Sequence, residues 1–107
     1  MTDVTENIYC TAEKAIGTTL IANARTRVTE WSFSKKGENT GWHLHEYDYV
    51  VVPMFSGNLL IDSGDEKVMS SLQEGVPYFR AKGVEHDVIN ANDFPCKFIE
   101  VEFLHSR

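Results

Sequence analysis

Short runs of alternating or continuous apolar residues, separated by turn residues every eight to twelve positions, constrain this chain most strongly. In residues 25–33, Thr29, Trp31 and Phe33 share one face by the two-residue period of a strand. Glycine-containing turns, such as residues 63–65, separate neighbouring runs. The pattern is typical of an all-β sandwich or barrel. The predicted strands are residues 18–22, 25–33, 41–46, 49–55, 59–62, 67–72, 76–80, 86–90 and 96–104.

The last predicted strand alternates most regularly of all. One face carries Ile99, Val101 and Phe103, and the other carries Phe98, Glu100 and Glu102. Glu100 and Glu102 form either a solvated face or polar groups of a cavity, and because carboxylates are mostly exposed in proteins, we expect the solvated face.

Length and composition predict one small globular domain over residues 1–107, with a core of about 18–104 after an N-terminal arm of 1–17. A formal net charge of −6 argues against nucleic acid or an anionic membrane as a partner, since both require clustered Lys and Arg. Residues 1–10 lack the apolar run of a signal peptide, and Cys10 and Cys96 form no C-x-x-C pair. We therefore expect a cytoplasmic protein with free thiols. Residues 11–16 predict at most one helical turn, with Thr11 as its N-cap.

Three of the four histidines suggest a metal site. His43 and His45 are two residues apart on a predicted strand, so their side chains leave the same face with Cα atoms about 6.6 Å apart. Two imidazoles at that separation can bind one cation at about 2.0–2.1 Å from each nitrogen. His86 begins a separate predicted strand after a turn, and in a rolled sheet it can face the same cavity. His105 lies beside the C-terminus, where fraying is expected, and is not included.

The surroundings of the first two histidines resemble one of the two motifs of the cupin family. This motif reads glycine, five residues, H-x-H, three or four residues, glutamate, six residues, glycine. Here five residues separate Gly37 from His43, which begins the H-x-H element, and six residues separate Val50 from Gly57. The spacing is intact, but the glutamate position counted in this way holds valine.

The second cupin motif reads glycine, five residues, P-x-G, two residues, histidine, three residues, asparagine. Gly75, Gly83, His86 and Asn90 match this pattern, and the proline alone is changed, to Ala81. The resemblance implies a jelly roll, also called a double-stranded β-helix, in which two antiparallel sheets leave a ligand cavity at one mouth. Residues 41–53 also resemble a narrower group of small cupins that includes a β-alanine degradation protein.

The missing glutamate leaves the metal donor set open, because cupins with the full motif use it as a ligand beside the histidines. Tyr49 lies at an even offset from His45 and reaches the metal face on an unbroken strand. Asp48 reaches that face only through a bulge, and Glu46 should point away. We predict a three-histidine site completed by water, with Asp48 or Tyr49 behind the ligands or as a weak ligand. Three neutral imidazoles suit Fe, Zn, Ni, Mn or Cu without distinguishing them.

Tyr49, Phe79 and Arg80 lie near the motifs and are candidate residues of a ligand pocket. Arg80 has the planar fork that holds a carboxylate. An aromatic residue on a barrel strand is more often core, however, and an arginine beside a turn is more often solvated.

Three functions fit the resemblance. The first is a metal-dependent enzyme acting on a small organic acid or related metabolite, with dioxygenase or isomerase chemistry as examples. The second is a metabolite-binding or sensing cupin in which the metal is structural or absent. The third is a degenerate cupin kept for dimerisation or for contact with a partner. For all three the family resemblance implies a homodimer, with residues 18–22 as the edge strand that pairs.

Overall fold

The computed structural model describes residues 13–104, which form strands joined by turns. Every strand lies within a predicted segment or extends it by one or two residues, so the predicted series of strands is confirmed. The described residues form β1 (Ile16–Ala22), β2 (Thr26–Phe33), β3 (His43–Leu44), β4 (Asp48–Pro53), β5 (Gly57–Asp62), β6 (Lys67–Leu72), β7 (Tyr78–Arg80), β8 (Glu85–Asn90) and β9 (Cys96–Phe103).

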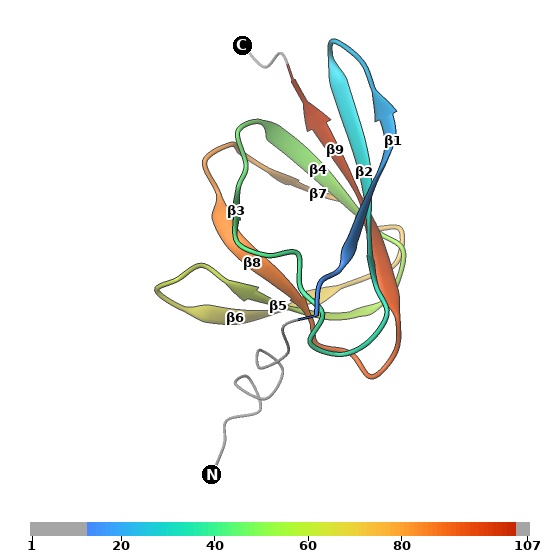
Figure 1. The fold of residues 1–107 in the computed structure, drawn as a ribbon, viewed down its shortest axis with the longest axis vertical. Coiled ribbons are helices and arrows are strands. Elements are labelled where there is room, and N and C mark those ends of the chain that lie inside the picture. Colours follow the sequence, from blue (N-terminus) through green and yellow to red (C-terminus); the bar gives the residue numbers. More distant parts are fainter. Residues whose placement is uncertain (1–12, 105–107) are drawn as a thin grey trace.

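The strands form two antiparallel sheets that face each other (Figure 1). One sheet has the order β1-β2-β9-β4-β7 and the other has the order β3-β8-β5-β6. The last strand, β9, lies between β2 and β4, so the chain returns from its far end to close the middle of the larger sheet. This is the predicted all-β jelly roll.

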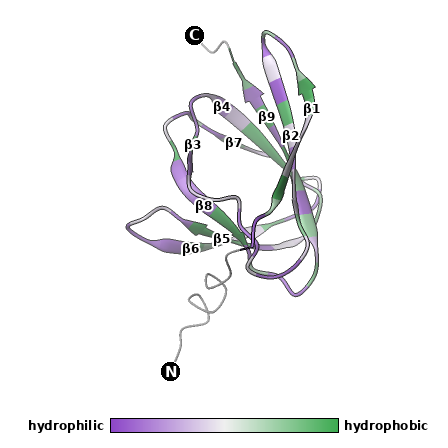
Figure 2. Cartoon of the chain, viewed as in Figure 1, coloured by the Kyte–Doolittle hydropathy of each residue, from purple (hydrophilic) through white to green (hydrophobic). Residues whose placement is uncertain are grey.

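The apolar core fills the space between the two sheets. β4 alternates strictly, with Tyr49, Val51 and Pro53 buried and the residues between them only half-buried. From the same sheet, Phe33 packs on Phe98 with 5.8 Å between the ring centroids. The facing sheet contributes a leucine or valine from each of β5, β6 and β8 to the same cluster. Figure 2 shows the resulting mixture of hydrophobic and hydrophilic segments along the strands.

Two motif glycines are required by close contacts and turn geometry. Gly57 begins β5, where an added Cβ would lie 2.4 Å from the side-chain oxygen of Asn92. Asn92 donates to the side-chain oxygen of Asn90 at 2.7 Å, so the motif asparagine holds the turn that follows β8. Gly83 has a φ of 102°, which a residue with a side chain rarely adopts. Its backbone N–H donates to the carbonyl of His45 at 2.8 Å and thereby positions that histidine.

The N-terminal segment differs from its prediction. The helical turn expected at residues 11–16 is absent from the part that is described, because Lys14 forms a bridge with Asn39 and Ile16 begins β1. Thr11 and Cys10 lie outside the described residues, and Cys96 is a buried free thiol. Across residues 13–104, no helix has the length and apolar character needed to cross a bilayer.

Candidate metal centre

The structure brings His43, His45 and His86 together through the short ladder between β3 and β8. His43 stands directly opposite His86 in this ladder. His45 follows β3, and its backbone N–H donates to the carbonyl of Val84 at 2.8 Å. The Nε2 atom of His45 lies 3.0 Å from Nε2 of His43 and 3.1 Å from Nε2 of His86. Three ring nitrogens from two chain segments therefore converge on one point.

These separations suit a shared cation. Nitrogens bound at about 2.05 Å lie about 2.9 Å apart in octahedral and about 3.3 Å apart in tetrahedral coordination, and the observed values fall between. Hydrogen bonding among the rings is a poorer solution, because Nε2 of His45 has one proton or one lone pair to share between two neighbours. The donor set therefore fits a divalent transition metal, and the spacing does not select one.

The tautomer of His43 favours the same arrangement. Nδ1 of His43 lies 2.8 Å from the carbonyl of Gly41, which can only accept, so Nδ1 carries the proton. In the neutral ring, Nε2 then presents its lone pair to the centre. Gly41 is itself held by Asp87, whose carboxylate accepts the Gly41 N–H at 3.0 Å. Such support behind a ligand orients the ring and strengthens metal binding.

Burial keeps the other two rings neutral. His45 is 4% exposed and His86 is 9% exposed. Burial, with a smaller contribution from His43, lowers the pKa of His45 to about 4. Burial and the neighbouring histidines lower the pKa of His86 to about 3. Both imidazoles are therefore in the unprotonated form that metal binding needs at neutral pH.

Two aromatic rings support the histidines from the larger sheet. Tyr49 stacks on His45 with 3.9 Å between the centroids, and Trp31 stacks on His43 at 6.5 Å. Tyr49 therefore reaches the histidine face, as its even offset predicted. The adjacent Val50, which holds the glutamate position of the motif, is on the opposite face of β4, so Tyr49 is the side chain that this part of β4 turns toward the histidines. Trp31 is contributed by β2, and its local sequence carries no signal of this contact.

A cavity of about 190 Å³ adjoins His86 and opens between the two sheets. Tyr49, Tyr78, Arg80 and Glu100 supply polar groups to its wall. Its other lining residues are Val51, Leu59, Ile61, Ser63, Ser70, Val84, Glu85, Val88 and Phe98.

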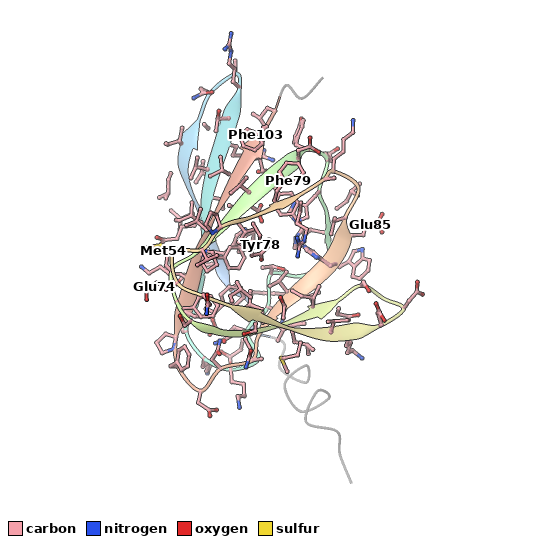
Figure 3. The ribbon with its side chains drawn as sticks, turned by 180° about the vertical axis from the view of Figure 1, so that it is seen from behind. Met54, Glu74, Tyr78, Phe79, Glu85 and Phe103 are labelled. Atoms are coloured by element: carbon pink, nitrogen blue, oxygen red, sulfur yellow. The ribbon has the colours of Figure 1, made fainter. Side chains whose placement is uncertain are left out.

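Two of the candidate pocket residues are turned away from this cavity. Phe79 is 56% exposed and lies on the face of β7 opposite to Tyr78, as can be followed from the labels in Figure 3. Asp48 accepts the backbone N–H of Lys82 at 2.8 Å and braces the turn before β8. Both follow from strand alternation, since β4 contains no bulge that would bring Asp48 inward.

The expectation that Glu100 and Glu102 lie on a solvated face is wrong. Glu100 is 8% exposed and Glu102 is 7% exposed, and both point to the interior of the roll. Arg27 forms a two-armed ion pair with Glu102, at 2.7 and 3.0 Å. Burial and the neighbouring Glu102 raise the pKa of Glu100 to about 7. Ligand atoms of both glutamates lie within 4.8 Å of a ring nitrogen of His45 and of each other. Strand alternation correctly predicted that Glu100 and Glu102 share one face. Their charge predicted an exposed face, which is wrong because the interior of the roll is itself polar here.

Known proteins are similar to this chain in sequence and in fold. No protein-family model matches the sequence. The crystal structure of a cupin domain from Bordetella pertussis is 48% identical, with a TM-score of 0.83, and the match covers 87% of this chain and 96% of that chain. This chain belongs to the cupins. The β-alanine degradation protein BauB of Pseudomonas aeruginosa is 44% identical over 89 residues, which are 83% of this cupin and 93% of that protein. A cupin superfamily protein from Desulfitobacterium hafniense, 16% identical with a TM-score of 0.66 over 89% of this chain and 83% of its own, shares the fold.

Proposed function

We propose that this cupin binds a divalent transition metal on His43, His45 and His86 and holds a small organic acid in the adjoining cavity. The observation that carries the proposal is the convergence of three imidazoles, with Nε2 of His45 lying 3.0 and 3.1 Å from Nε2 of His43 and of His86. Fe, Zn, Ni, Mn and Cu all accept such ligands.

The chain's own residues prepare this site for a ligand. A metal bound here supplies polarisation of a carbonyl, or activation of water or dioxygen. The cavity wall beside His86 is largely apolar, which limits the water that can compete with a ligand. Arg80 lines the same cavity and offers donors to a carboxylate. The proposed enzyme activity is therefore a dioxygenase- or isomerase-type reaction of a small acid.

The name of the Pseudomonas aeruginosa relative supports a metabolic setting. That protein is named for β-alanine degradation and is 44% identical to this chain. We extend the same role to this cupin, with a ligand drawn from the small acids of that pathway. We also propose a cytoplasmic location, which agrees with the free thiol of Cys96.

A second candidate is a sensing cupin that binds the metabolite without transforming it. The observation that favours it is that the β4 side chain stacked on His45 is Tyr49, a phenol and not a carboxylate. A phenol whose pKa is raised by burial is a much weaker metal ligand than a carboxylate.

Elemental analysis of the purified protein tests the metal site. One equivalent of metal should be present after purification or reconstitution, and His43→Ala and His86→Ala should each lose it. His105→Ala, which removes a histidine outside the predicted set, is the control and should retain the metal. Metal absent from the wild type, or retained by both site variants, would overturn the proposal. Oxygen uptake by the iron-loaded protein with a panel of small acids then separates an oxygenase from a sensor.

A further inference from the structure

The inner wall of the five-stranded sheet carries polar side chains in two cross-strand rows. Strand register places them, because residues paired across an antiparallel ladder share a face. The first row is Arg27, Glu102, Tyr49 and Arg80, and the second is Thr29, Glu100, Val51 and Tyr78, each taken in order from β2, β9, β4 and β7.

The two glutamates of this wall are in different situations. Glu102 has both carboxylate oxygens bound by Arg27 and does not line the cavity. Glu100 does line the cavity, and within residues 13–104 no hydrogen bond or ion pair reaches its carboxyl group. No buried side-chain nitrogen or oxygen atom of residues 13–104 lacks a hydrogen-bond partner, so the carboxyl oxygens of Glu100 are open to the cavity rather than enclosed in the core. An acid kept in this state beside a cavity is typical of a group whose partner is a ligand.

A positively charged side chain, Arg80, lies on β7 at the edge of the same sheet. Arg80 stacks over Tyr78 at 4.6 Å and donates one N–H to the carbonyl of Phe79 at 3.1 Å. Arg80 is exposed, and among the described residues it forms no ion pair, so its remaining donors are available at the solvent-accessible rim of the cavity. Register separates Arg80 from Glu100 by two strands, about 10 Å, and by one row along the strands, about 7 Å. Their side chains therefore bracket the cavity rather than pair with each other.

The size of the cavity suits a small molecule between these two groups. A volume of about 190 Å³ corresponds to about six water molecules at roughly 30 Å³ each. A ligand of about six to eight non-hydrogen atoms fills it. To meet both groups such a ligand needs a positive charge at one end and a negative charge at the other.

We propose that Glu100 and Arg80 make this cavity selective for short ω-amino acids, with the ammonium group on Glu100 and the carboxylate on Arg80. The inference rests on the proposed function in one respect, namely that the cavity beside the three histidines is the ligand site. An α-amino acid carries both charges on one carbon and cannot span the two residues. A plain carboxylic acid of the same length satisfies Arg80 but displaces water from Glu100 without giving its carboxyl group a partner.

Calorimetric titration of the full-length, metal-loaded protein tests this selectivity. The probes are ω-amino acids of three to five carbons, each compared with the unsubstituted acid of equal length. The wild type should bind the amino acid at least about tenfold more tightly, the range of a charge-assisted hydrogen bond in a buried site. Glu100→Gln, which keeps the side-chain shape, should lose the preference and retain the plain acid. Arg80→Gln should weaken both.

Glu85→Gln is the matched control. Glu85 lines the same cavity from β8, but it is exposed, and its label in Figure 3 marks its place on the other sheet. Glu85 lies on the facing sheet, opposite Leu44, and not in either of the two rows, so its replacement should leave the preference unchanged. A preference that survives in Glu100→Gln, or a wild type that binds neither acid or both equally, would overturn the inference. The wild-type comparison decides even if a variant fails to fold.

Metal analysis of each titrated sample separates this inference from the proposed function. Selectivity that depends on Glu100 in protein that takes up no metal would support the inference and overturn the metal proposal. Stoichiometric metal in protein that shows no selectivity would support the metal proposal and overturn the inference.

Discussion

Replacing Glu100 with glutamine should raise the stability of the metal-free protein above pH 7 and change it little near pH 5. The unfolded chain titrates this group near pH 4.5, and the folded chain near 7. Between these values the folded protein holds the proton and the unfolded chain does not. Because unfolding then releases a proton, the free energy of unfolding falls as pH rises through this window. Each tenfold difference in proton affinity is worth about 1.4 kcal/mol, so the wild type loses up to about 3 kcal/mol.

Urea unfolding between pH 5 and 8 in the presence of a chelator measures this effect, with tryptophan fluorescence as the signal. Glutamine cannot ionise, so the difference between Glu100→Gln and the wild type should grow with pH to about 3 kcal/mol above pH 7. His45 and His86 titrate in the opposite sense, but they do so in both proteins and cancel in the difference. Glu85→Gln should give a flat difference because Glu85 is exposed. Parallel curves for Glu100→Gln and the wild type would refute the reasoning.

Three further predictions concern the support of the site, the turn before β5 and the assembly. Asp87→Ala removes the acceptor that holds the loop before His43, and metal affinity measured by competition with a chelator should fall about tenfold or more. Gly57→Ala forces a Cβ against Asn92, and thermal unfolding should show a loss of about 1–3 kcal/mol, whereas an unchanged melting temperature would contradict the contact. A second copy should cover the exposed edge strand β1, so light scattering should give a dimer that Ile21→Glu dissociates; a monomeric wild type would exclude it.

The strands and their turns could be predicted because their signals are local. Tyr49, Val51 and Pro53 alternate with less buried residues in β4, and any sheet that buries one face requires that period. The predicted bounds are less accurate where the sequence pattern is weaker. Residues 41–46 were predicted as one strand, but β3 is His43–Leu44 alone.

The metal centre was partly predictable for the same reason. His43 and His45 leave one face of an extended segment whatever the rest of the chain does. The position of His86 beside them could be predicted only from the spacing of the cupin motifs. The pairing of β3 with β8 joins residues about forty positions apart, and the local alternation of a strand does not indicate which distant strand it will pair with.

The sequence by itself determined which residues share a face, where the chain turns and which side chains have metal-binding chemistry. Tertiary structure alone decided which face is inside, and it reversed the expectation for Glu100 and Glu102. It also paired Arg27 with Glu102 and left Glu100 to the cavity, since those contacts depend on the order of β2, β9 and β4 in the sheet. The physical reason is that alternation is a property of the backbone, whereas burial and charge compensation arise only when distant strands pack together.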